Sequence, residues 1–170
     1  RDWSGLHRAL AARLAAMPGV QAVAYAKRLP YMVDSTTEVQ TPGQAPRRVV
    51  ISRVSPNYFD TLGIAILGGR ALREGDLPLS NIAEKTICPV VVSQHLASAF
   101  WPGQNPLGQG LQDSEGNALE VVGVVGDLAS TRLGQMDEPM IYQPLELTGT
   151  YPPHPFVRFS GDGIALARAI

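Results

Sequence analysis

The first third of the chain changes from a helical hydrophobic period to short apolar runs. Apolar residues recur at steps of three and four residues over the first helix, at Trp3, Leu6, Leu10, Leu14 and Met17. Pro18 and Gly19 then predict its end. The expected elements that follow are strands over 20–27, 38–40 and 47–54, with a loop at 29–34 and a turn at 41–43.

From residue 86 onward, short apolar runs alternate with turn-forming residues. The pattern predicts strands over 87–92, 107–112, 119–125, 140–144 and 156–159, and short helices over 94–100 and 163–170. A Ser-Glu-Gly-Asn run at 114–117 separates two of these strands and predicts a hairpin. The remaining polar stretches are expected to be connections, at 73–85, 127–138 and 148–155. This mixture of elements predicts an α+β fold.

Residues 54–70 form one unit, a helix with its own start and stop signals between two strands. The hydroxyl of Ser55 is placed to cap the helix by accepting a hydrogen bond from a backbone amide. Pro56 suits the first helical position, and Gly63 suits the left-handed residue that ends a helix. Three residues predict a packed face, Tyr58, Phe59 and Leu62. A short buried strand is expected at 64–67, stopped by the glycines at 68 and 69.

The composition permits one folded domain or two small subdomains. The chain has 170 residues, 45% of them hydrophobic, and a net charge of −1, which gives no electrostatic basis for nucleic-acid binding. Its single cysteine, Cys88, excludes an intramolecular disulfide and lies in an apolar run that predicts a buried thiol. No signal peptide and no apolar run as long as a membrane span is visible. The chain opens in one predicted helix and stops in another, so we expect it to be part of a longer protein.

Residues that often bind metals lack the required spacing. The three histidines, His7, His95 and His154, form no H-E-x-x-H or Cys/His pattern, so surface or capping roles are expected. An alternating polar run, Asp113, Glu115 and Asn117, suggests a calcium loop, but its glycine stands at the fourth place and not the sixth. The tip of a hairpin is the better interpretation, and we expect neither a metal nor a cofactor.

Other catalytic motifs are also missing from the sequence. The glycines at 123 and 126 lack the G-x-G-x-x-G spacing, and no helix is expected after them, so Asp127 is interpreted as starting a turn. There is no G-x-S-x-G elbow, which leaves Ser55 and Ser93 without a nucleophile's context. There is also no P-loop lysine, so ATP hydrolysis by that route is not expected.

Residues 54–70, VSPNYFDTLGIAILGGR, resemble the signature of the MacB-type periplasmic core domain, the extracytoplasmic domain of FtsX-like ABC transporter permeases. Asn57, Asp60 and Ala65 are mild departures from the residues common there. The resemblance continues in order through PVVVS at 89–93, AFWPG at 99–103, NPLGQ at 105–109, VVGVVGD at 121–127, IYQP at 141–144 and VRFSGD at 157–162. The signature residues it singles out are structural: Ser55, Pro56, Tyr58, Phe59, Gly63 and Arg70.

The resemblance implies a fold and its division. It implies an α+β protein in which a porter-like βαβ subdomain is interrupted by a β-rich, sabre-like insert. The expected boundaries are 1–85 for the first part of the porter-like subdomain, 86–148 for the insert and 149–170 for the return to a truncated porter-like subdomain.

The resemblance also implies a mechanical and non-enzymatic role on the extracytoplasmic side of a bacterial plasma membrane. A separate cytoplasmic ATPase would hydrolyse ATP, and the membrane part of the permease would pass the movement outward to export or extract a substrate. A periplasmic adaptor or a second permease subunit would be a further partner. We expect the isolated domain to be monomeric and to bind no nucleic acid.

Two other functions stay open at this point. Glycine- and proline-rich loops on a compact scaffold could form a free-standing module that binds a small ligand or a peptide. An unrecognised hydrolase would use scattered groups such as His95 or Asp127. Membrane spans in the flanking sequence would separate the permease from the free-standing module. Turnover that is lost on substitution of His95 or Asp127 would favour the hydrolase.

Overall fold

The computed structural model describes residues 4–27, 29, 35–76, 87–127, 138–146 and 153–161. Its helices are α1 (Ser4–Ala15), α2 (Tyr58–Leu62) and α3 (Gln94–Phe100). Its strands are β1 (Val20–Ala26), β2 (Ser35–Gln40), β3 (Arg47–Val54), β4 (Ile66–Gly69), β5 (Cys88–Ser93), β6 (Gly110–Asp113), β7 (Ala118–Val125), β8 (Met140–Pro144) and β9 (His154–Phe159). The predicted α+β class is confirmed. The predicted helix at 163–170, Trp3 and most of the predicted connections lie outside the described residues.

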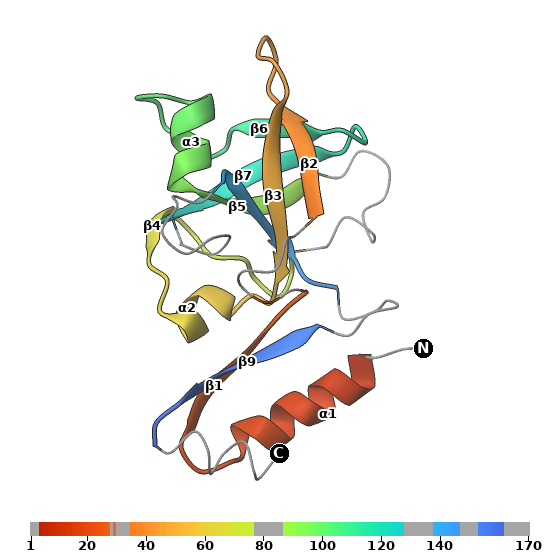
Figure 1. Ribbon diagram of the computed structural model, residues 1–170, viewed down its shortest axis with the longest axis vertical. Helices are drawn as coiled ribbons and strands as arrows, with labels where there is room; N and C mark the ends of the chain where they lie inside the picture. Colours follow the sequence, from red (N-terminus) through yellow and green to blue (C-terminus); the bar gives the residue numbers. More distant parts are fainter. Residues whose placement is uncertain are drawn as a thin grey trace.

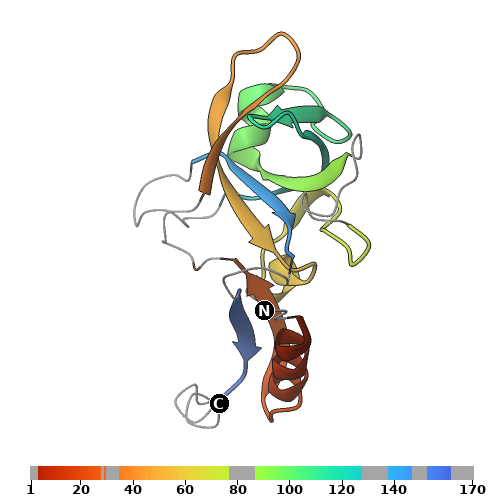
Figure 2. The same cartoon turned by 90° about the vertical axis from the view of Figure 1, so that its right-hand side faces the viewer.

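Six strands close into a ring, which we call the barrel. They are hydrogen-bonded in the order β2–β6–β7–β5–β8–β3, and the antiparallel β2–β3 pairing joins the two ends of this path. The ring mixes directions, because β3 pairs with β8 and β5 with β7 in parallel. Strand β4 pairs antiparallel with the end of β7 at residues 123–125, beyond the part of β7 that pairs with β6 at 118–120 (Figures 1 and 2). The order of elements was predictable, but the closure of the ring was not.

Strand alternation fills the barrel interior with apolar side chains. Because successive side chains point to opposite faces of a sheet, alternate positions share the interior. These buried residues are Val39, Val49, Cys88, Val90, Val92, Leu111, Leu119, Val121 and Ile141, with Leu96 and Phe100 of α3 in the same cluster. Burial of one valine or leucine side chain contributes about 1.5–3 kcal/mol. The cluster is therefore a principal source of stability.

The polar side chain of Gln143 shares this interior. Gln143 follows Ile141 by two positions on β8, so it points to the same face of the sheet. It is 1% exposed, and neither atom of its side-chain amide has a hydrogen-bond partner among the described residues. A buried amide of this kind costs about 1–3 kcal/mol of desolvation. Gln143 is therefore a polar defect in an apolar core.

Helix α1 and strands β1 and β9 form a second part, which we call the basal layer (Figure 1). Strands β1 and β9 pair antiparallel along their length, whereas β1 meets β3 in register only at Ala26↔Val54. Helix α1 packs on this ribbon through the buried Leu14. The first and last described elements of the chain thus lie together in the basal layer.

The buried face of α1 differs from the prediction. Leu6 is 57% exposed, whereas His7, for which a surface or capping role was expected, is 5% exposed. The His7 ring lies edge-on to Tyr25 of β1, with centroids 5.5 Å apart, and the Tyr25 hydroxyl donates to the His7 carbonyl at 3.1 Å. The hydrophobic period of the sequence placed the buried face of α1 on Leu6, one residue away from His7. It could not indicate His7, because the burial of His7 involves a contact with Tyr25 of another element.

The described elements also bear on membrane spanning and on the predicted division of the chain. None of the described helices is long and apolar enough to cross a bilayer. The division at residues 86 and 148 stays a prediction, and the described hydrogen bonds cross it at β2–β6, β3–β8 and β4–β7. The insert predicted from the resemblance is thus bonded into one barrel with earlier strands.

Candidate functional site

A joint connects the barrel to the basal layer just after β3. The Ser55 hydroxyl accepts a hydrogen bond from the Tyr25 amide at 2.8 Å, and the Ser55 amide donates to the Tyr25 carbonyl at 2.8 Å. The same hydroxyl donates to Oδ1 of Asn57 at 2.8 Å, and the Asn57 side chain donates to the Val23 carbonyl at 2.6 Å. We call this pair the Ser55–Asn57 clamp. It ties the end of β3 to β1.

The predicted cap and first helical residue of α2 are corrected by this geometry. Helix α2 begins at Tyr58, with Asn57 in the cap position and no side-chain capping bond, so Ser55 is not the cap. Pro56 lies in the turn before the helix, where the Tyr58 amide donates to the Ser55 carbonyl at 3.0 Å. The Ser55 hydroxyl accepts instead from the amide of Tyr25, which lies 30 residues earlier in the chain, so a local sequence pattern could not reveal this bond.

The end of α2 is as predicted, and β9 supports it. Gly63 is left-handed, with φ of 72°, and its amide donates to the Asp60 carbonyl at 3.1 Å. Arg158 of β9 donates through Nε to the Thr61 carbonyl at 3.0 Å. A Cβ added at Gly63 would lie 3.0 Å from a guanidinium nitrogen of Arg158. Glycine thus meets both the backbone conformation and the close approach of β9.

The aromatic residues of α2 join both parts of the molecule. Tyr58 lies edge-on to Phe156 of β9, with centroids 5.6 Å apart, and Phe59 lies edge-on to Tyr142 of β8, with centroids 5.0 Å apart. The prediction that both are buried is confirmed, whereas Leu62 is exposed and Thr61 takes the third buried place. The strand that follows begins at Ile66, two residues later than predicted, and includes the glycines that were expected to stop it.

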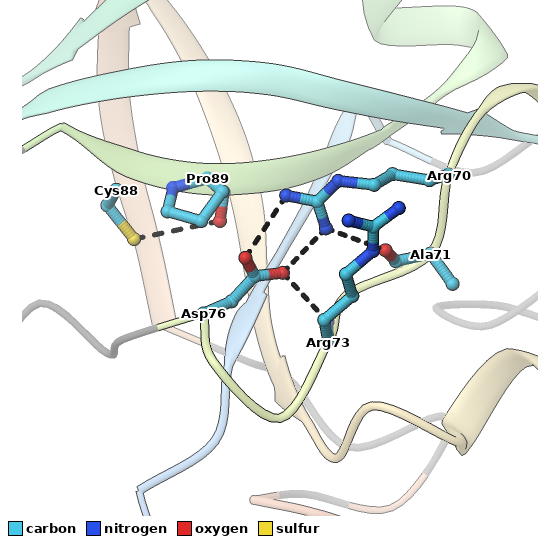
Figure 3. Close-up of polar contacts among 6 residues, drawn as sticks. All are labelled: Arg70, Ala71, Arg73, Asp76, Cys88 and Pro89. Atoms are coloured by element: carbon cyan, nitrogen blue, oxygen red, sulfur yellow. Dashed lines mark hydrogen bonds and ion pairs between the residues drawn. The ribbon is translucent and has the colours of Figure 1, made fainter.

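Arg70 anchors the segment that leaves β4 (Figure 3). Its guanidinium donates two hydrogen bonds to the Asp76 carboxylate, at 2.8 and 3.1 Å, and the Arg73 amide donates a third at 2.7 Å. Burial raises the pKa of Asp76, but these bonds and the charges of both arginines outweigh it and hold the pKa below its ordinary value. The bond to Asp76 raises the pKa of Arg70 in return. The three groups form a staple around residues 70–76.

Cys88 lies beside this staple in Figure 3, and its environment does not activate the thiol. Its side chain is buried at the start of β5, as predicted, and burial raises the pKa of the thiol to about 12. Since the thiolate is the reactive form, a thiol with this pKa is not an activated nucleophile at neutral pH.

The acidic residues considered as catalytic or metal-binding candidates make structural hydrogen bonds to nearby backbone amides. Asp127 accepts a hydrogen bond from the backbone amide of His95 at 2.7 Å, so its carboxylate caps the start of α3. The turn predicted to start at Asp127 lies outside the described residues. Asp113 accepts bonds from the amides of Glu115 and Asn117 at 3.0 and 2.8 Å, which confirms the hairpin tip. Across the described part of the chain, no group of three potential ligands could hold a metal ion.

Sequence reasoning overlooked a second helix cap. The Ser93 hydroxyl accepts hydrogen bonds from the Leu96 amide at 3.3 Å and from the Met140 amide at 3.1 Å. It therefore starts α3 and also fixes the beginning of β8. A serine directly before an apolar helical run is a standard signal for such a cap, and it was available in the sequence.

Two grooves lie at the end of the barrel near α3. The first has a volume of about 700 Å³ and lies between the β2–β3 turn, Trp101 and residues 109–112. Glutamines are the commonest residues along its wall, and none of the described residues that line it is charged. The second groove has a volume of about 470 Å³ and lies between β4, α3 and the loop at 101–107. We call the first one the glutamine groove.

Comparisons with known proteins agree on the fold. A family model described as the MacB-like periplasmic core domain matches residues 1–165. Among solved structures, the periplasmic region of MacB from Actinobacillus actinomycetemcomitans is similar, with a TM-score of 0.66 and 20% identity over 95% of this chain and 69% of that one. The extracellular domain of the noncanonic ABC-type transporter YknZ from Gram-positive bacteria gives 0.61 and 17%, over 92% and 74%.

A domain of a putative permease protein from Porphyromonas gingivalis is similar too, with a TM-score of 0.62 and 19% identity over 93% of this chain and 70% of that one. A search of curated protein sequences finds no significant match. At these identities the structural likeness concerns the fold alone, whereas the family model matches nearly the whole sequence.

Proposed function

Because the chain belongs to the family of MacB-like periplasmic core domains, the extracytoplasmic domains of ABC transporter permeases, we propose that it works by mechanotransmission. Closure of a cytoplasmic ATPase moves the membrane helices of the permease. The domain moves with them and acts on a substrate or a partner outside the membrane. ATP hydrolysis belongs to the separate ATPase, and this chain contributes movement and no catalysis.

The arrangement of the basal layer is the observation that carries this proposal. The first described helix, α1, and the last described strand, β9, lie together in this layer, so force applied at both enters the molecule at one place. From there it reaches the barrel through the Ser55–Asn57 clamp, the bond from Arg158 to Thr61 and the aromatic contacts of α2. A short, bonded joint transmits displacement, whereas a flexible linker would absorb it.

The proposal also names partner classes. The ATPase acts on this domain only through the membrane part of the permease. A periplasmic adaptor or a second permease subunit would receive the movement on the barrel, because the barrel lies away from the basal layer. The division into porter-like and sabre-like subdomains is part of the proposal, with the joint as the mechanical connection between the basal layer and the rest.

The test measures movement in the full permease with its ATPase in lipid vesicles. In a Cys88→Ala background, spin labels are placed at Gln21, exposed on β1, and at Glu115, exposed at the β6–β7 turn. On ATP binding we expect the distance from Glu115 to the membrane surface to change, while the distance from Gln21 to Glu115 stays constant. An ATPase-inactive variant provides the control without turnover.

A loosened joint provides the second arm of this test. The double variant Ser55→Ala with Asn57→Ala removes the clamp, so ATP hydrolysis should continue while the movement at Glu115 becomes smaller or broader. If Glu115 keeps its position relative to the membrane throughout ATP turnover, the mechanical proposal is wrong.

A further inference from the structure

We propose that the glutamine groove binds an uncharged, extended peptide segment of a partner protein, which pairs with the free edge of β6 at Gly110. This inference goes beyond mechanotransmission and does not depend on it, because the binding can be measured on this chain alone. Three observations carry it: a gap in the strand ladder, a buried polar group at the groove and the chemistry of the lining.

The ladder between β2 and β6 stops early. Its register contains Val39↔Asp113 and Gln40↔Gln112, and the described strands separate after this point. The next position on β6 with the same orientation is Gly110. The residue of the β2–β3 turn that would lie opposite is Pro42, which has no N–H to donate. The chain cannot complete the ladder at this position with its own turn.

Hydrogen bonds to β7 show where the backbone of Gly110 points. The Val121 amide donates to the Gln109 carbonyl at 3.0 Å, and the Asp113 amide donates to the Asn117 carbonyl at 3.1 Å. In an antiparallel pair, alternate residues direct their N–H and C=O groups to the same neighbour. Gly110, between these positions, therefore directs its backbone groups away from β7 and into the groove, which it lines.

One residue that lines the groove, Thr41, has a buried hydroxyl without a hydrogen-bond partner among the described residues. Thr41 is 7% exposed, and the unpaired atom is Oγ1. The oxygen itself is enclosed, and buried hydroxyls are normally satisfied, so a rotation of the Thr41 side chain toward the groove would let a polar group of the occupant satisfy it. Thr41, which follows β2, and Gly110, on β6, both line this groove.

The lining selects an uncharged occupant that both donates and accepts hydrogen bonds. Glutamine amides offer both kinds of group, and the described lining carries no charge to pair with an ionic ligand. A peptide backbone has this chemistry and can extend a strand ladder. A glycan would need an exposed aromatic face, but Trp101, the single aromatic residue among the described residues of the lining, is only 6% exposed. The observations therefore favour a peptide.

The experiment titrates the ¹⁵N-labelled chain with a hexapeptide of alternating valine and threonine, capped at both ends. We expect backbone amide shifts at Gly110 and Thr41. The same peptide with N-methylated backbone amides should bind about fivefold more weakly or worse, since each lost hydrogen bond contributes about a factor of five. Hexapeptides with three glutamates or three lysines should also bind more weakly.

Two variants at one position provide the matched comparison. Gly110→Pro removes the N–H and should weaken binding of the capped peptide about fivefold, whereas Gly110→Ala keeps the N–H and should not. An alanine Cβ there would lie 4.0 Å from the Leu119 carbonyl oxygen, an ordinary contact, so Gly110→Ala should fold normally. If Gly110→Pro does not fold, the N-methylated peptide still decides the question in the unaltered chain. Equal binding of the parent and N-methylated peptides, or shifts with chitotetraose but not with the peptide, would overturn the proposal.

Discussion

The barrel and the basal layer use the same kinds of element but gain their stability differently. All five residues of β8 in the barrel are buried, whereas no residue of β9 in the basal layer is. A closed ring of strands encloses its own interior, so alternating apolar residues are enough to bury one another. A two-stranded ribbon has no interior and is marginal on its own. The basal layer therefore depends on α1, on α2 and on the joint.

The largest effect tests this difference directly. Leu119→Ala removes a fully buried side chain from the barrel interior and should cost about 2–5 kcal/mol of unfolding free energy. Val157→Ala on the half-buried β9 should cost about 1 kcal/mol or less. Chemical denaturation of both variants measures the two values. Equal losses would mean that the basal layer has an interior as well packed as that of the barrel.

The second effect has the opposite sign. Gln143→Met replaces the unsatisfied amide inside the barrel with an apolar side chain of similar length and should raise stability by about 1–3 kcal/mol. Gln21→Met, on the exposed face of β1, should change stability by less than about 0.5 kcal/mol. Thermal denaturation compares the two. A destabilised Gln143→Met variant would show that the amide makes a necessary bond inside the barrel.

The third effect tests the joint between the two regions. Gly63→Val forces a β-branched side chain into the left-handed region against Arg158, which should cost about 1–2 kcal/mol. Gly68→Val is the matched control, because an added Cβ there meets nothing within 4 Å and no left-handed φ is required. The midpoint of thermal unfolding should fall for the first variant only. An unchanged midpoint for Gly63→Val would mean that α2 can end in another conformation.

The smallest effect concerns the staple and depends on pH. The pKa of Asp76 is lower in the folded protein than its ordinary value of 3.8, so the folded state favours the charged carboxylate. Asp76→Asn should therefore cost about 1 kcal/mol at neutral pH. This stabilisation is fully present above the unfolded pKa and disappears as the pH falls through the lower folded pKa. The stabilities of the two proteins, measured from pH 7 to pH 2, should thus converge at the acidic end. A difference that stays constant with pH would exclude the charge as its cause.

Local signals in the sequence predicted many elements well. The bounds of β3, α3 and β8 agree with the predicted ranges, because each is an apolar run between strong turn or helix-stop signals. The role of Gly63 was also predictable, since the left-handed conformation that ends a helix favours glycine, and a glycine is visible at that single position of the sequence. The hairpin tip at Asp113 and the buried Cys88 belong to the same class of local inference.

Contacts between two distant segments of the chain were not predictable from local sequence patterns. The Ser55 hydroxyl looked like a cap because caps depend on the next three residues, but it bonds to Tyr25 in another strand. The face of α1 was placed on Leu6 because hydrophobicity was counted without knowing that His7 meets Tyr25. The glutamine groove had no local signal at all, since it arises where β2 and β6 separate.

The amino-acid sequence by itself determined the class of fold, the order of its elements and, through its ordered motifs, the family to which the chain belongs. The tertiary structure alone decided that six strands close into a barrel, that Ser55 and Asn57 fasten the basal layer to it, and that Gly110 faces a groove. Backbone propensity and hydrophobic period act over a few neighbouring residues, so one chain segment records them. Ring closure and the joint depend on pairs of segments many residues apart, and only the folded chain brings those together.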